Sequence, residues 1–174
     1  MRFLLLGIFL IIIGGCSIFQ EVESPKKYTK IHYSGYFTLS IPTLMLVNAK
    51  IFDSDGTVIV FDNNKQLSGF IITREKDNLP EAFDLREYPK YLLELKETDS
   101  LSTDVKNMFE LSSKEFNESL NSPVVSIYEE VNKIYYVACK KKSCVTFIIM
   151  KDQNEQIFML TSKGFSWSFL KNFI

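Results

Sequence analysis

Two cysteines, Cys139 and Cys144, flank a polar four-residue turn and could carry three kinds of chemistry. They could form a disulfide, stay as buried thiols, or act as metal or redox ligands. A structural zinc site needs four protein ligands, and His32 is the only histidine in the sequence. Residues that face each other on antiparallel strands lie within reach of a disulfide. We therefore predict a structural disulfide and expect neither a metal nor a cofactor.

Two aspartates, Asp53 and Asp55, are the second candidate for chemistry. They belong to the sequence Asp-Ser-Asp-Gly-Thr, which follows an apolar run and resembles the first motif of haloacid-dehalogenase-type phosphatases. The resemblance implies that Asp53 is a nucleophile and Asp55 a general acid/base, with Mg²⁺ bound between carboxylate and phosphate. A secreted Mg²⁺-dependent phosphatase is therefore one alternative function.

The surroundings of these aspartates favour a hairpin turn instead. An apolar run at residues 59–61 returns soon after Gly56, whereas the phosphatase family would continue into parallel βα units. The family's late acidic pair is also absent, because Asp152 stands alone in its segment. Asp and Gly are typical turn residues, so we expect a hairpin loop at residues 53–56. His32 has no Ser or Cys nucleophile nearby and is expected to be structural.

Positive charge gathers in the turn between the cysteines, in a chain that is otherwise nearly neutral. This turn contains Lys140, Lys141 and Lys142, which could contact anionic lipid headgroups or glycans. A solvated loop tip is the simpler expectation. The chain as a whole has 20 Lys and Arg against 21 Asp and Glu, which argues against a nucleic-acid partner.

The beginning of the chain contains the most specific motif. Arg2 precedes an apolar run at residues 3–13, which ends in Gly14-Gly15-Cys16. As a helix this run would span roughly 16 Å, far less than the ~30 Å of a hydrocarbon core, so we predict a signal peptide over residues 1–15. Its end resembles the lipobox of bacterial lipoproteins. That resemblance implies cleavage before Cys16, acylation of the Cys16 thiol, and attachment to a membrane through lipid.

The residues that follow indicate where the protein would lie. Ser17 stands directly after Cys16, and a residue other than Asp at that position implies the outer membrane in Gram-negative lipoproteins. Residues 16–30 contain Pro25 and no sustained period, so we expect a tether of about 20 Å root-mean-square length. The folded part is then expected in the bacterial cell envelope, at the outer membrane and facing the periplasm.

Residues 31–174 are predicted to form a single α+β domain that positions these groups. Aromatic residues make up 14% of the chain and Gly and Pro are scarce, which excludes a disordered tract. Alternating apolar and polar residues predict four strands in an antiparallel meander, at residues 36–41, 47–52, 57–61 and 67–73. Apolar spacings of three and four predict helices at residues 85–96, 102–120 and 166–174. Within the second, Ser112 or Ser113 is expected to start a short final helix.

Four further strands are predicted at residues 124–129, 133–139, 144–150 and 156–161, and here the apolar residues stop alternating. If the two cysteines face each other, Tyr135 and Ile148 lie on one face, and Tyr136 and Phe147 lie on the other. Because both faces are apolar, we expect these strands at the centre of an antiparallel sheet with helices packed on both faces.

This order of elements, with two short motifs, resembles the PsbP-like fold, which includes bacterial lipoproteins of the DcrB type. The motifs are the opening strand Gly35-Tyr36-Phe37-Thr38-Leu39-Ser40-Ile41-Pro42 and the segment Gly164-Phe165-Ser166 before the last helix. The resemblance implies an α+β domain but no particular chemistry, because the fold carries many binding and assembly roles.

Taken together, these features predict a non-catalytic binding module that is anchored to the envelope and has an envelope protein as its partner. A peptide, a glycan or a toxin could also be the ligand, so a toxin-neutralising immunity lipoprotein is a second alternative.

Lipidation at Cys16 has a direct test. Replacing Cys16 by Ala removes the thiol that would be acylated, so the variant is expected to accumulate as an uncleaved precursor that takes up no labelled palmitate. Gel mobility and palmitate labelling in cells check both points, with the wild-type chain as the control. A variant that is processed and labelled like the wild type would contradict the lipoprotein assignment.

Overall fold

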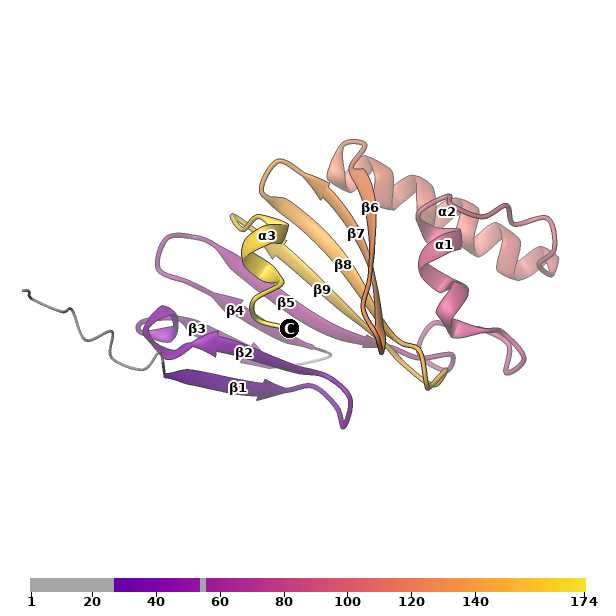
Figure 1. Cartoon of the computed structure of the whole chain (residues 1–174). Coiled ribbons are helices and arrows are strands. Elements are labelled where there is room, and N and C mark those ends of the chain that lie inside the picture. The colour runs from indigo at the N-terminus through magenta and orange to yellow at the C-terminus, as the bar shows by residue number, and fades with distance from the viewer. Residues whose placement is uncertain (1–26, 54–55) are drawn as a thin grey trace, which may run out of the picture.

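The computed structural model describes residues 27–53 and 56–174, and it combines an antiparallel sheet with a few helices in an α+β arrangement (Figure 1). The predicted signal peptide, Cys16 and Ser17 lie outside the described residues. Within the described part of the chain, no helix is long and apolar enough to span a membrane.

Seven strands form one antiparallel sheet, and two more form a separate hairpin. The sheet has the strand order β3-β4-β5-β9-β8-β7-β6, and the hairpin pairs β1 with β2. The hairpin strands are β1 (Tyr28–His32) and β2 (Thr38–Pro42). The sheet strands are β3 (Lys50–Asp53), β4 (Thr57–Val60), β5 (Gln66–Ile72), β6 (Val124–Glu129), β7 (Lys133–Lys140), β8 (Ser143–Met150) and β9 (Ile157–Lys163).

The helical elements are short apart from one. They are η1 (Thr43–Leu46), η2 (Leu85–Glu87), α1 (Tyr88–Leu92), α2 (Thr103–Leu120) and α3 (Trp167–Leu170), of which η1 and η2 are 3-10 helices. The regular turns of α1 begin with Pro89 in the first turn, where its missing N–H needs no partner. The helices predicted at residues 85–96 and 166–174 are shorter in the structure, where the corresponding α-helices are α1 and α3.

The two-faced pattern predicted for the later strands is present in the sheet. Cys139 lies opposite Cys144, and Tyr136 lies opposite Phe147. The side chains of β7, β8 and β9 alternate between two separate buried clusters, one on each face of the sheet. These strands are consequently apolar on both faces, because both faces are covered.

Different elements cover the two faces. Leu92 of α1 and Phe109 of α2 share one cluster with Phe147. On the other face, Leu39 of β2 and Leu170 of α3 share a cluster with the sheet residue Ile148. The chain thus encloses one sheet between a helical layer and a layer made of the hairpin and the C-terminal segment (Figure 1).

The prediction of one four-strand meander is wrong for its first strand. Residues 36–41 were expected to pair with the strand at 47–52, but β2 pairs with β1, whose residues 28–30 were expected in the tether. The physical reason is burial, since Leu39 and Ile41 are fully buried against a face of the main sheet. The apolar side chains on that face must be shielded from water, and a strand added at the edge of the sheet would not cover them. The strands β3, β4 and β5 do form the predicted meander.

The prediction of a break in the second helix is also wrong. The helix α2 runs without interruption through residues 112 and 113. Ser113 is buried, and its hydroxyl donates to the carbonyl of Leu92 at 2.7 Å instead of capping a new helix. The Ser113 hydroxyl is therefore satisfied by a hydrogen bond to the end of α1. The sequence pattern alone predicts that this hydroxyl caps the start of a new helix.

The Cys139–Cys144 disulfide is present, as predicted, and joins β7 to β8 with Cα atoms 4.2 Å apart. Non-reducing mass spectrometry of the native protein should therefore find the two cysteine peptides linked. Complete alkylation of both thiols without prior reduction would contradict the bond.

The disulfide is expected to stabilise the domain less than the sheet core does. The variant Cys139→Ser/Cys144→Ser should fold and lose less than the ~3 kcal/mol that a fifteen-residue loop would give, because these cysteines are only 5 residues apart. Phe147→Ala, which empties a fully buried site, should cost about 3–5 kcal/mol. Urea denaturation of both variants measures the comparison, and the reverse order of the two losses would contradict it.

Candidate functional site

Asp53 lies at the end of β3, in the hairpin that the sequence predicts. Strand β3 is antiparallel to β4, and Asp53 is opposite Thr57, whose hydroxyl donates to the Asp53 carboxylate at 3.3 Å. Asp55 lies outside the described residues. The strand that follows Asp53 is therefore the returning strand of a hairpin, not the start of a parallel βα unit.

A surface pocket of about 290 Å³ brings Asp53 near His32, although the two residues are distant in the sequence. His32 shares a hydrogen bond of 3.0 Å with the hydroxyl of Thr38. Burial raises the pKa of Tyr33, which also lines the pocket, to about 12. Tyr33 packs directly over Gly69, where a Cβ would come within 2.4 Å of the tyrosine ring. In the described part of the chain, no three His, Cys, Asp or Glu residues gather as a metal site would require.

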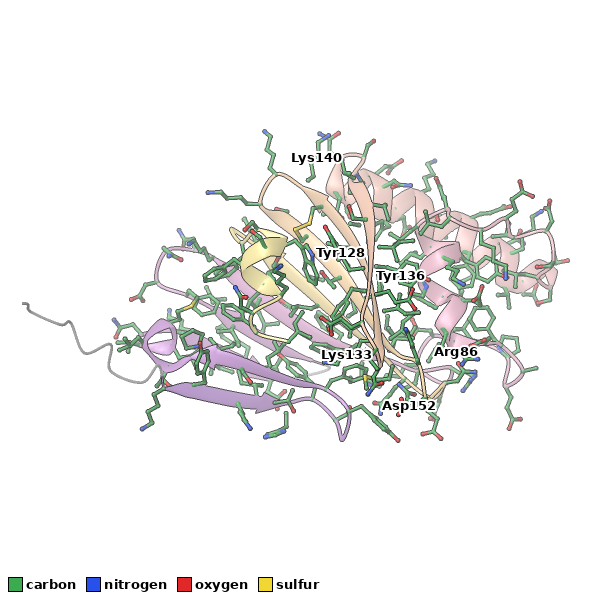
Figure 2. The ribbon with its side chains drawn as sticks, in the orientation of Figure 1. Arg86, Tyr128, Lys133, Tyr136, Lys140 and Asp152 are labelled. Atoms are coloured by element: carbon green, nitrogen blue, oxygen red, sulfur yellow. A yellow bond between two sulfur atoms is a disulfide. The ribbon has the colours of Figure 1, made fainter. Side chains whose placement is uncertain are left out.

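A second pocket, of about 350 Å³, is lined by three aromatic side chains. Tyr128 comes from β6, Tyr135 from β7 and Trp167 from α3. The Trp167 ring centre is 5.5 Å from that of Tyr128 and 5.7 Å from that of Tyr135. Figure 2 shows Tyr128 between β6 and α3. We call this pocket the aromatic groove.

Charged groups of both signs surround the aromatic groove. The Tyr135 hydroxyl donates to the Glu130 carboxylate at 2.8 Å, and burial together with this hydrogen bond raises the pKa of Tyr135. Glu129 accepts a hydrogen bond from the Lys151 ammonium at 2.6 Å. Lys171 lines the side formed by α3. The groove can therefore take a planar or apolar group against its rings and hydrogen-bond polar atoms at its rim.

The aromatic groove opens beside an unpaired edge of the sheet. Because β6 is the last strand in the sheet order, the outer row of its N–H and C=O groups has no partner strand in the described residues. Apolar side chains are exposed along it, with 69% of Val124 and 55% of Ile127 accessible to solvent. An exposed apolar edge of this kind is a template for pairing with another chain.

The lysine turn lies at the far end of β7 from the aromatic groove. Lys140 donates to the carbonyl of Ser122 at 3.4 Å, and none of Lys140, Lys141 and Lys142 forms an ion pair with a described residue. Among the described residues, the structure therefore separates the sequence-predicted candidates into two places, which are the pocket lined by Asp53 and His32 and the disulfide with its lysine turn. The predicted lipid site, Cys16, lies outside the described residues.

Sequence reasoning missed the aromatic groove. Its three rings come from two strands and a helix, and their separation along the chain hides their proximity. The one available signal was Trp167, the only tryptophan of the chain, which the spacing of the last helix assigned to no particular face. Comparison of the chain with protein-family models, curated proteins and solved structures found no match.

Because Asp53 lies in a hairpin and not at the end of a parallel strand, we predict that it has no catalytic role. The Asp53→Asn variant keeps the hydrogen bond from Thr57 available and should change stability by about 1 kcal/mol or less, as exposed substitutions do. With p-nitrophenyl phosphate and Mg²⁺, wild type and variant should release the same background amount of product. Release by the wild type that is lost in a folded Asp53→Asn variant would contradict this and favour the phosphatase.

Proposed function

We propose that this protein is a lipid-anchored lipoprotein of the bacterial cell envelope that acts as a non-catalytic binding module. The lipobox-like residues Ile13-Gly14-Gly15-Cys16 support the anchor, and the outer membrane facing the periplasm is the location that Ser17 favours. The cover of one sheet face by α1 and α2, and of the other by β1, β2 and α3, supports a PsbP-like arrangement with helices on both faces.

The observation that carries the binding function is the meeting of the aromatic groove with the edge of β6. Tyr128 belongs to both, because it lies on the edge strand and stacks near Trp167. A ligand at this place could pair with the backbone of β6 and insert a side chain between aromatic rings. Extended protein segments bind in this way, with main-chain hydrogen bonds for affinity and side-chain pockets for specificity.

We therefore assign an extended segment of an envelope protein as the ligand class. The apolar lining of the groove suits an aromatic or aliphatic side chain, and Glu130 and Lys171 at the rim suit polar groups on either side of it. The rings would supply most of the binding free energy, because buried Trp and Tyr are the usual hot spots of protein interfaces.

Site-specific photo-crosslinking in cells tests this assignment. A photo-reactive amino acid replaces Ile127, which is exposed on β6, and in a control it replaces Leu111, which is exposed on α2. We expect a discrete protein adduct from position 127 and none from position 111. Equal adducts from both positions, or none from position 127, would contradict a ligand on β6.

The contribution of the aromatic groove is tested in the same crosslinking background. Trp167→Ala should weaken binding by about 2 kcal/mol or more, as truncation of a hot spot does, and remove most of the adduct at position 127. Phe169→Ala is the matched control, since Phe169 lies on the same helix but stacks on Phe165 instead of lining the groove. If both variants behave alike, the groove does not hold the ligand.

A further inference from the structure

We propose that the end of the domain at which the chain enters is a docking surface for an anionic lipid bilayer. It is formed by lysines from four separate segments, which we call the basic rim: Lys27, Lys65, Lys140, Lys141, Lys142 and Lys163. The inference adds an orientation on the membrane to the proposed lipid anchor and rests on that anchor for its setting.

Strand pairing brings the lysines of the sheet together. Lys163 at the end of β9 lies opposite Ser143 of β8 on one side and Gln66 of β5 on the other. The next residue, Gly164, donates its N–H to the carbonyl of Lys142 at 2.7 Å. It also lies so close to Lys65 that a Cβ on it would be 2.5 Å from the lysine Cγ. The β4–β5 turn, the β7–β8 turn and the end of β9 thus form one continuous edge.

The chain enters the domain at this same end. The N–H of Thr43, at the start of η1, donates to the carbonyl of Lys27 at 2.8 Å. Leu44 of η1 lines a pocket of about 220 Å³ together with Lys65 and Phe165. In Figure 1 the start of β1, η1 and the β4–β5 turn lie side by side at the left end of the molecule.

The charge of the basic rim is available to a ligand. No member of the rim forms an ion pair with a residue in the described ranges. Lys65 lies 5.2 Å from the centre of the Phe165 ring, and this contact leaves the charge itself uncompensated. The nearby carboxylate of Asp62 accepts a hydrogen bond from Asn48. Six lysines at one end fall within the range of about four to eight basic residues that is typical of a polybasic lipid-binding cluster.

Exposed apolar residues distinguish a bilayer from other polyanions. Leu44 is 87% exposed and Val47 is 58% exposed, and both lie beside Lys65 in the same pocket. A nucleic acid or a soluble anionic glycan offers nothing for such side chains. A membrane interface takes apolar residues into the boundary of headgroups and acyl chains while lysines contact the phosphates.

The length of the preceding segment fits this orientation. Eleven residue steps separate Cys16 from Lys27, so an acylated Cys16 would hold Lys27 within about 40 Å of the bilayer even at full extension. The basic rim is the part of the domain nearest this point of attachment. Docking therefore requires no rearrangement of the domain. It requires only that the rim moves the remaining distance to the bilayer surface.

The test uses the full-length protein bound to lipid vesicles. A fluorophore is attached to Val47→Cys, which lies beside Lys65 of the rim, or to Val131→Cys at the opposite end as a control. The vesicles contain a lipid with a nitroxide on its headgroup. The vesicles are of phosphatidylcholine alone or of phosphatidylcholine with phosphatidylglycerol. We expect quenching at position 47 on the anionic vesicles, weaker quenching there on neutral vesicles, and none at position 131.

Charge variants separate the basic rim from the lipid anchor. Each lysine near an anionic surface contributes about fivefold to the docking equilibrium, so Lys140→Gln/Lys141→Gln/Lys142→Gln should lower it about 100-fold and abolish quenching at position 47. The variant Lys76→Gln/Lys114→Gln/Lys133→Gln makes the same charge change elsewhere and should leave quenching intact. About 1 M NaCl, where the Debye length is about 3 Å, should abolish it as well.

The outcomes distinguish the two proposals. Failure of the protein to float with neutral vesicles would contradict the lipid anchor and leave quenching on anionic vesicles as the test of the rim. Flotation with equal quenching at position 47 on neutral and anionic vesicles would overturn the basic rim. Binding of heparin at the rim without quenching by anionic vesicles would overturn it too, in favour of an anionic glycan.

Discussion

The pairing of β5 with β9 holds the whole structure together. These strands belong to two different meanders, and seven residue pairs, from Gln66 with Lys163 to Ile72 with Ile157, join them in the middle of the sheet. Without this pairing, the first meander would be a three-stranded sheet with little to pack on. With it, each face of the sheet is wide enough to require a packed layer that buries its apolar side chains. The hairpin, together with α3, provides this layer on one face, and α1 and α2 provide it on the other.

The sheet also keeps two surfaces apart. Strand β7 begins at Lys133, beside the aromatic groove, and ends at Lys140 in the basic rim, and the two residues mark its ends in Figure 2. At about 3.3 Å per residue the strand is roughly 25 Å long. A domain docked through the rim would therefore present the groove and the end of β6 near Tyr128 away from the bilayer, where a partner in the adjacent compartment could reach them. The basic rim and the aromatic groove are thus compatible in one molecule.

Local patterns predicted much of the sheet, and pairing between distant segments explains what they missed. The apolar residues on both sides of β7 and β8 predicted a central position, and the register of Tyr136 with Phe147 agrees with it. The alternation in residues 36–41 predicted a strand but not its partner, because a covering hairpin and an edge strand have the same period. The groove and the rim could not be predicted for a related reason. Both depend on residues such as Trp167 and Lys65 that only the β5–β9 pairing and the return of the C-terminal segment bring into place.

The central claim is that both meanders form one cooperative sheet, since the basic rim takes Lys65 from the first and Lys163 from the second. Native-state hydrogen exchange of the full-length protein tests it most directly. We predict that the amides bonded between β5 and β9 and those between β8 and β9 exchange together as the slowest set, through global unfolding, while the edge strands β3 and β6 exchange faster. Exchange of the β5 amides at a clearly lower opening free energy than the β8 amides would show two separable units and contradict the account.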